Sequence, residues 1–103
     1  MTLRELQSKF VLMVGKLIIF AYENGIELSF GDAYAKTGHK TNSNHYIRLA
    51  IDLNAFVGGM YMDTGPKMEE VHNKLHDYWD SLGGAARIKD DLNHYSVDFM
   101  GRR

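Results

Sequence analysis

Residues 44–62 read NHYIRLAIDLNAFVGGMYM, and they carry the clearest structural signal in the chain. Alternate positions from 47 to 53 are apolar: Ile47, Leu49, Ile51 and Leu53. This is the period of a β-strand that buries one face. Gly58-Gly59 then separates two apolar triplets, residues 55–57 and 60–62, and paired glycines suit the tight turn of a β-hairpin. The segment therefore predicts antiparallel strands.

Apolar stripes with helical spacing lie on both sides of this segment. The first recurs every three or four residues and comprises Leu3, Leu6, Phe10, Met13, Leu17 and Phe20. Ile18 and Ile19 widen its face, which favours a buried helix over a coiled-coil seam, and Gly25 suits a C-terminal cap near Asn24. The second predicts a helix from Pro66 to Leu82. Its expected inner face comprises Met68, Val71, Leu75, Tyr78, Trp79 and Leu82.

Two shorter segments complete the expected sheet. Ile26, Leu28 and Phe30 alternate with polar residues, and a last strand is expected around His94 to Phe99. Residues 38–44 are polar and rich in turn formers, so they predict a loop. A chain of 103 residues has room for one core and not for two. We therefore expect one α+β domain over residues 1–103, with a small antiparallel sheet packed with two main helices.

Composition excludes several classes of partner and site. Twelve basic and thirteen acidic residues give a net charge of -1, which argues against a broad basic surface and hence against a nucleic-acid partner. The chain has no cysteine, so any metal must be held by histidine and carboxylate side chains. The most apolar stretch, Phe10 to Tyr22, is interrupted by Gly15 and Lys16 and is shorter than the roughly 20 residues of a membrane span. We expect no integral membrane segment, and the N-terminus lacks the pattern of a signal peptide.

The best candidates for a metal site are His45, Asp52 and His94. A catalytic zinc site uses three such side chains and keeps one position open. His45 and Asp52 are seven residues apart, and an odd separation within one strand would point them to opposite faces, so His45 must lie in the turn before the strand. Asp91 precedes His94 by three residues and is a candidate general base. Each signal is weak taken singly, because such spacings arise by chance and Asp91 also suits a solvated turn or a helix cap.

Three other histidines need an interpretation. His72 and His76 are one helical turn apart, as in helical zinc proteases, but Asn73 stands where that motif has a glutamate directly after the first histidine. We interpret this pair as surface or boundary residues of the second helix. His39, in the polar loop, suits a substitute ligand, a substrate contact or a solvated loop residue.

The segment SNHYIRLAIDLN, residues 43–54, followed by DLNHYS, residues 91–96, resembles the M15 family of zinc peptidases. The likeness is greatest to the small bacteriophage-type subgroup that includes L-alanyl-D-glutamate peptidase endolysins. The family pattern has a serine two residues before a histidine, an alanine five and an aspartate seven residues after it, and later an acid three residues before a second histidine. All these positions are filled here. Residues 17–34, LIIFAYENGIELSFGDAY, and 78–84, YWDSLGG, extend the resemblance to most of the chain.

The resemblance implies a hedgehog/D-Ala-D-Ala peptidase-like zinc site. His45, Asp52 and His94 are then the ligands of Zn²⁺, Asp91 is the general base, and the expected substrate contacts are Ser43, Arg48 and Arg87. The implied activity is hydrolysis of an amide of the peptidoglycan stem peptide, of the L-alanyl-D-glutamate endopeptidase type. A phage lysis enzyme of this kind would be a monomer that collects in the host bacterial cytoplasm and reaches the wall after membrane permeabilisation.

Two departures from the subgroup keep other functions open. Many members have glycine where this chain has Arg48, and an arginine usually stands where this chain has Ala35 followed by Lys36. That arginine would help to stabilise a developing oxyanion. Lys36, Arg48 or Arg87 is a possible substitute. The alternatives are a D-alanyl-D-alanine carboxypeptidase, which the ligand motif does not exclude, and a catalytically silent, zinc-stabilised protein of cell-wall binding or assembly.

Overall fold

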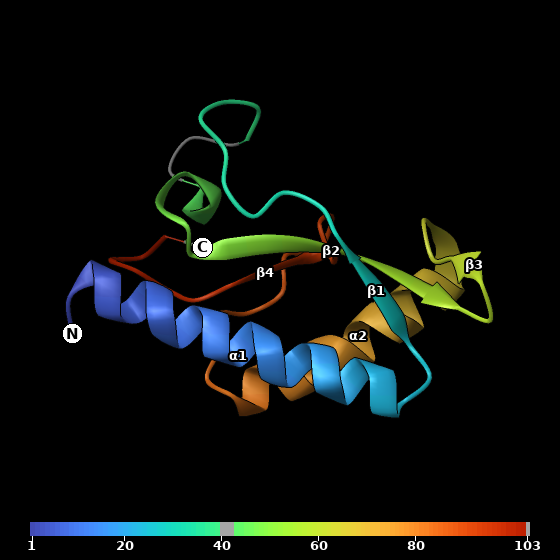
Figure 1. The fold of residues 1–103 in the computed structure, drawn as a ribbon. Coiled ribbons are helices and arrows are strands. Elements are labelled where there is room, and N and C mark those ends of the chain that lie inside the picture. The colour runs from blue at the N-terminus through green and yellow to red at the C-terminus, as the bar shows by residue number, and fades with distance from the viewer. Residues whose placement is uncertain (40–42, 103) are drawn as a thin grey trace.

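Two long helices and a small antiparallel sheet make up the fold, which confirms the predicted α+β class (Figure 1). The computed structural model describes residues 1–39 and 43–102. Helix α1 spans Leu3–Glu23 and helix α2 spans Gly65–Ser81, close to the predicted bounds. The other elements are β1 (Glu27–Phe30), the short 3-10 helix η1 (Asn44–Ile47), β2 (Ala50–Val57), β3 (Met60–Tyr61) and β4 (His94–Ser96).

Strand β2 is the centre of the sheet. It pairs antiparallel with β1 and with β4, and through the predicted hairpin with β3, where Phe56 lies opposite Tyr61. Gly58 and Gly59 both have positive φ, 58° and 80°, as a two-residue hairpin turn of this type requires. The strand begins at Ala50 and not at the predicted Ile47, because Arg48 adopts a left-handed conformation with φ 57° that ends η1.

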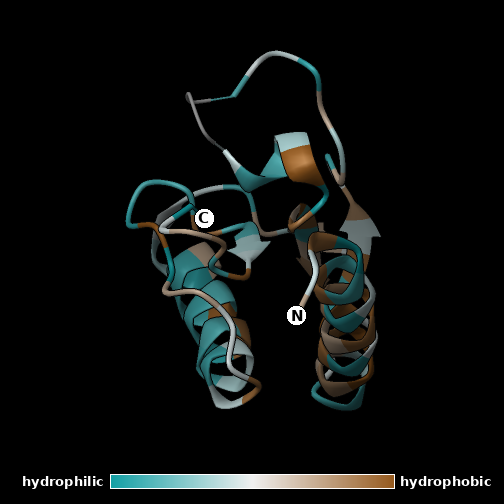
Figure 2. Cartoon of the chain, turned by 90° about the vertical axis from the view of Figure 1, so that its left-hand side faces the viewer, coloured by the Kyte–Doolittle hydropathy of each residue, from teal (hydrophilic) through white to brown (hydrophobic). Residues whose placement is uncertain are grey.

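Both helices lie along the same side of the sheet, next to each other (Figure 2). The core between them contains fully buried side chains from each layer, such as Leu17 of α1, Leu53 of β2 and Trp79 of α2. Helix α1 begins with a capping box, in which the Thr2 hydroxyl accepts a hydrogen bond from the Glu5 N–H and the Glu5 carboxylate accepts one from the Thr2 N–H. None of the described helices is long and apolar enough to cross a membrane.

Two apolar residues that the sequence predicted on buried faces are exposed. Ile19 of α1 is 62% exposed, because the core lies on the side of the helix that carries Met13, Leu17 and Ala21. Phe30 is 69% exposed, although the alternating pattern places it on the same face as Leu28 and Ile26. It is the last residue of the edge strand β1, and it borders an apolar pocket together with Phe10, Val11 and Val14 of α1.

The interpretation of His72 and His76 as surface or boundary residues is wrong. Both are buried, with 1% and 0% of their surface exposed. Helix α2 packs against Tyr95 of β4, and this region supplies polar partners: His72 Nδ1 lies 2.7 Å from the Tyr95 hydroxyl, and His76 Nε2 donates to the Leu92 carbonyl at 2.7 Å. The His76 ring also stacks on Tyr95, with 4.1 Å between centroids. Burial is tolerated because these ring nitrogens are hydrogen-bonded.

Candidate metal centre

Three elements position the side chains that were predicted as metal ligands. His45 lies in η1, before β2, as its odd separation from Asp52 required. On one side of β2, the Asp52 backbone is hydrogen-bonded to the segment that follows β1. The Asp52 N–H donates to the Asp32 carbonyl, and the Asp52 carbonyl accepts from the Gly31 N–H. On the other side Asp52 lies directly opposite His94 of β4. The two form a pair without backbone hydrogen bonds between them, which is the type of pair whose side chains lie closest together.

The three side chains converge on one point. His45 Nε2 lies 3.1 Å from Asp52 Oδ1 and 3.2 Å from His94 Nδ1, and His94 Nδ1 lies 3.5 Å from Asp52 Oδ1. Ligands at about 2.0–2.1 Å from a tetrahedral zinc are about 3.3 Å apart. The observed triangle therefore has the size of one face of a zinc tetrahedron. His45 and His94 are buried, whereas 19% of the Asp52 side chain is exposed, so the triangle is open on one side.

The charge of Asp52 suits a metal ligand. Burial raises the pKa of its carboxyl, but hydrogen bonds and attraction from His45 and His94 outweigh this effect and hold the pKa well below its usual value. Asp52 is therefore ionised at neutral pH, as ligation of a divalent cation requires. Two neutral imidazoles and one carboxylate form a donor set that zinc binds readily, so the residues present fit the ion.

Asp91 lies beside this triangle, in the tight turn that leads into β4. Its carbonyl accepts from the His94 N–H at 3.0 Å, and its Oδ2 lies 3.9 Å from His94 Nδ1. The Asp91 side chain is about half exposed. A carboxylate at this position has access both to the metal centre and to solvent, as a general base needs. One carboxylate oxygen of Asp91 also lies within 4.8 Å of the potential metal-binding atoms of Asp52 and His94.

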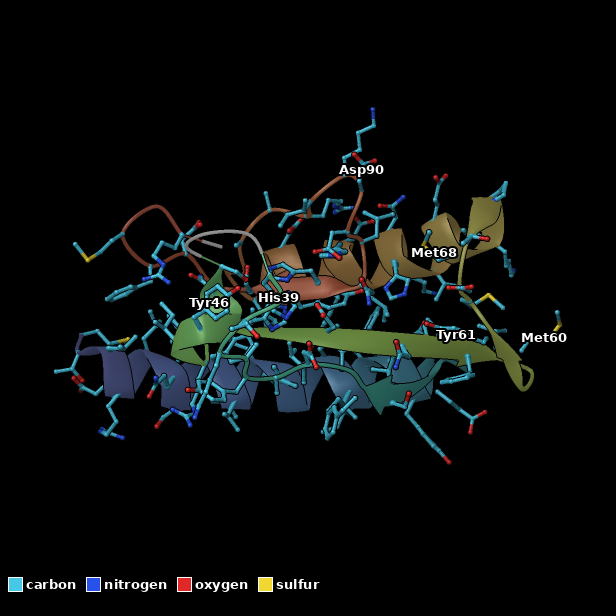
Figure 3. The ribbon with its side chains drawn as sticks, turned by 90° about the horizontal axis from the view of Figure 1, so that it is seen from above. His39, Tyr46, Met60, Tyr61, Met68 and Asp90 are labelled. Carbon is cyan, nitrogen blue, oxygen red and sulfur yellow. The ribbon has the colours of Figure 1, made fainter. Side chains whose placement is uncertain are left out.

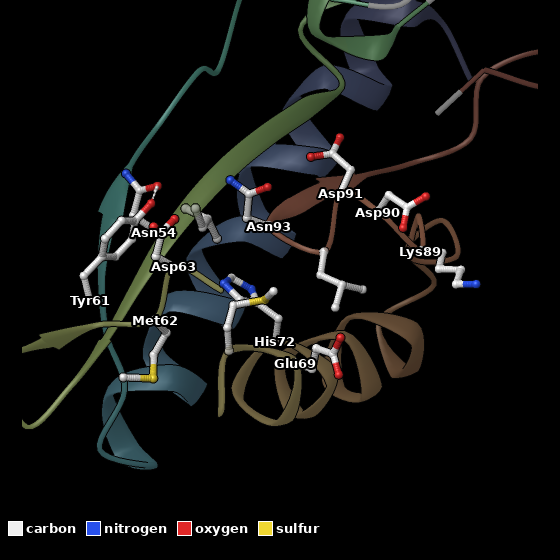
Figure 4. Close-up of a pocket in the computed structure, with 13 residues that line it drawn as sticks. Asn54, Tyr61, Met62, Asp63, Glu69, His72, Lys89, Asp90, Asp91 and Asn93 are labelled. Atoms are coloured by element: carbon white, nitrogen blue, oxygen red, sulfur yellow. Dashed lines mark hydrogen bonds between the residues drawn. The ribbon is translucent and has the colours of Figure 1, made fainter. Parts of the chain in front are cut away.

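A pocket of about 340 Å³ adjoins Asp91 (Figure 4). The turn at residues 89–93, the β2–β3 hairpin and the start of α2 form its walls, and its lining is mostly polar. The polar and charged lining residues are Asn54, Tyr61, Asp63, Glu69, His72, Lys89, Asp90, Asp91 and Asn93. The volume suits part of a small peptide; of the four candidate site residues only Asp91 lines the pocket, and its carboxylate points away from Glu69 and His72 in Figure 4.

The three residues expected to contact substrate lie in different surroundings. Ser43 caps η1, and its hydroxyl accepts from the His45 N–H at 3.3 Å. The Arg48 guanidinium lies over the Tyr34 ring, 4.0 Å from its centroid. Arg87 forms ion pairs with Asp77 and Asp80 of α2 at 2.8 and 2.9 Å. Ser43 therefore caps the short helix that carries the candidate ligand His45, while the guanidinium groups of Arg48 and Arg87 already contact Tyr34 and the two aspartates of α2.

Two residues next to the centre were not recognised from the sequence. The sequence leaves the role of His39 open and gives no reason to expect Asp32 beside it. The His39 ring stacks on the His45 ring with 4.0 Å between centroids, and His39 Nε2 lies 3.1 Å from Asp32 Oδ2. The only sequence signal for Asp32 is its place in the FGDAY element at residues 30–34, and this does not specify a partner.

Comparison of the chain with protein-family models, with curated proteins and with solved structures found no match in any of the three. What can be said of function therefore rests on the residues and their geometry.

Proposed function

We propose that the chain is a zinc-dependent peptidase of the hedgehog/D-Ala-D-Ala peptidase-like kind, which hydrolyses an amide of the peptidoglycan stem peptide. The observation that carries the proposal is the convergence of His45, Asp52 and His94 from η1, β2 and β4, with Asp91 beside them. These are the same four positions that the resemblance to the M15 family implied. The L-alanyl-D-glutamate bond is the proposed site of cleavage.

The metal, Asp91 and the adjoining pocket have distinct parts in this reaction. Zinc, when bound, supplies a Lewis acid that polarises the scissile carbonyl. Asp91 takes a proton from the attacking water and returns it to the leaving amine. The pocket beside Asp91 holds the neighbouring part of the peptide. The amide and hydroxyl groups that line the pocket form hydrogen bonds with the backbone and polar side chains of that peptide.

The biological setting belongs to the same proposal. A phage lysis enzyme of this type would act as a monomer, without a nucleic-acid partner, and would reach the wall from the host bacterial cytoplasm once the membrane is permeabilised.

One observation favours a second candidate, a silent wall-binding or assembly protein. Ala35 replaces the usual arginine, and the charges of Arg48 and Arg87 are engaged with Tyr34 and with Asp77 and Asp80.

Mass spectrometry of wall fragments separates these functions. Zinc-loaded protein is incubated with purified peptidoglycan, and the masses of the products are measured. An endopeptidase releases fragments cut within the stem peptide, whereas a D-alanyl-D-alanine carboxypeptidase removes only terminal alanine. If zinc-loaded protein releases no fragments and co-sediments with the walls, the chain is a silent wall-binding protein.

We expect Asp91→Asn to bind zinc as the wild type does and to cleave at least about 100-fold more slowly, because general acid–base catalysis contributes about 10²–10⁴ in rate. Product release and zinc content are measured on the same preparations. Asp98→Asn is the matched control, since Asp98 is exposed and does not line the pocket. An Asp91→Asn variant that keeps full activity would remove Asp91 as the base.

A further inference from the structure

His39 lies directly against the triangle of ligands, although it comes from the loop before η1. Its ring is nearly parallel to that of His45, at 21°. In Figure 3 His39 and Tyr46 are next to each other at the end of the molecule where η1 lies. About a fifth of the His39 side chain is exposed, so this ring lies partly between the metal centre and solvent.

Three contacts hold His39 in this place. Its backbone N–H donates to the Tyr46 hydroxyl at 2.8 Å, and the same hydroxyl donates to the His39 carbonyl at 2.8 Å. The third contact joins the ring to the Asp32 carboxylate, 3.1 Å from Nε2. Tyr46 is the residue after His45. The position of the His39 backbone is therefore linked to the same short helix that presents a metal ligand.

The contact with Asp32 has a consequence for the other ring nitrogen. A carboxylate accepts hydrogen bonds, so a neutral His39 places its proton on Nε2 and keeps a lone pair on Nδ1. Metal-binding histidines characteristically donate their second ring nitrogen to a carboxylate or carbonyl, which fixes the tautomer and the orientation of the ring. The pair Asp32 and His39 has this arrangement.

His39 is also within reach of the ion. One of its ring nitrogens and the ligand atoms of His45 and Asp52 all lie within 4.8 Å of one another. Because ligands of a tetrahedral zinc are about 3.3 Å apart and each imidazole binds a metal in its own ring plane, the His39 ring must move closer and turn out of its stack on His45 to enter the coordination shell. We propose that His39, oriented by Asp32, is a fourth and removable protein ligand of the metal bound by His45, Asp52 and His94.

This ligand would control access to the centre. A catalytic zinc site keeps one position for water or substrate, whereas a site with four protein ligands is closed. With His39 bound, the centre is in a closed resting state. When His39 withdraws, the fourth position becomes available. The inference rests on the metal centre of the proposed function, but it does not depend on which bond is cleaved.

The test measures zinc binding and not activity. Zinc affinity of the full chain is measured by competition with a chelator for the wild type, His39→Ala, Asp32→Asn and the double variant, with Asp98→Asn as the control. In parallel, the imidazole ¹⁵N signals of the wild type are recorded with and without zinc, with His76, which does not line the pocket, as the internal reference. Circular dichroism shows whether each variant retains the helices.

We expect His39→Ala to weaken zinc binding at least tenfold and the His39 nitrogen signal to move on addition of zinc. Asp32→Asn should weaken binding in the wild-type background and change little further once His39 is absent, because Asp32 acts through His39. Unchanged affinity in His39→Ala together with an unmoved His39 signal would overturn the inference and leave the three-ligand centre intact. A wild type that binds no zinc would overturn both this inference and the proposed function.

Discussion

Gly31 shows how one residue sets the position of the candidate metal ligand Asp52. A Cβ atom at this position would lie 3.0 Å from Asp52 Cβ and 3.1 Å from the Asp52 carbonyl oxygen. The Gly31 N–H donates to that same oxygen at 2.7 Å, so the backbone at Gly31 lies close to the backbone of β2 at Asp52. The absence of a side chain at residue 31 allows the backbone to approach β2 directly behind the Asp52 carboxylate.

We expect Gly31→Ala to displace Asp52 by a few tenths of an ångström and to weaken zinc binding by about tenfold, the scale on which changes around metal ligands act. Chelator competition measures this change. Gly15→Ala is the control, because a Cβ at Gly15 in helix α1 meets nothing within 4 Å. It should leave zinc affinity unchanged and increase the free energy of unfolding by about 0.5–1 kcal/mol. Equal zinc affinities in the two variants would show that the close approach at Gly31 does not position Asp52.

Among the elements, α2 and β4 depend on each other through Trp79. The Trp79 indole is fully buried and donates from Nε1 to the Ser96 carbonyl at 2.8 Å. Gly84 follows the helix end and passes directly over this ring, where a Cβ would overlap the indole. His76 donates to the Leu92 carbonyl one helical turn earlier, so α2 holds the chain on both sides of His94, and Asp91 directly precedes the first of these contacts.

Gly84→Ala should therefore lower the free energy of unfolding by about 3 kcal/mol, because the indole must move and its hydrogen bond weakens. Urea denaturation monitored by the fluorescence of this single tryptophan measures the loss. Gly83→Ala is the matched control: it lies in the same turn, and a Cβ there meets nothing within 4 Å. Its φ of 91° still makes the substitution unfavourable, at about 1 kcal/mol. A Gly84→Ala variant no less stable than Gly83→Ala would contradict this packing.

For the molecule as a whole, the buried His72 and His76 make stability depend on pH. Burial lowers the pKa of both from about 6.5 to about 4. Between these values the folded protein keeps both rings neutral while the unfolded chain takes up protons, so stability falls as the pH falls from 6.5 towards 4. The loss amounts to at most about 3 kcal/mol for each histidine.

Urea unfolding at pH 7, 6, 5 and 4.5 measures this loss, in the presence of a chelator so that release of metal does not contribute. In the wild type we expect the free energy of unfolding to fall steadily over this range. His72→Gln should start from a lower stability at pH 7 and fall less steeply, since one of the two titrating groups is gone. The same slope in both proteins would mean that the burial of His72 is not what makes the protein sensitive to acid.

Much of the fold follows from local patterns. The apolar alternation at residues 47–53, the Gly58-Gly59 turn and the helical stripes predicted the α+β class, the hairpin and nearly the right helix bounds. These features were predictable because periodicity and turn formation depend on residues close together in the chain. The spacing of His45 and Asp52 likewise predicted that His45 precedes the strand.

The remaining features depend on which distant segments meet. The same helical pattern is compatible with an exposed or a buried His72 and His76, and only the packing of α2 against Tyr95 supplies the contacts that bury them. Phe30 is exposed although its partner across the sheet, Leu53, is fully buried, because alternation gives the face of a residue but not whether the end of an edge strand is covered. The pairing of Asp52 with His94 across β2 and β4, and the approach of His39 and Asp32 to His45, are likewise non-local. Local sequence specifies the elements, whereas a metal centre forms only where residues far apart in the chain are brought within a few ångströms.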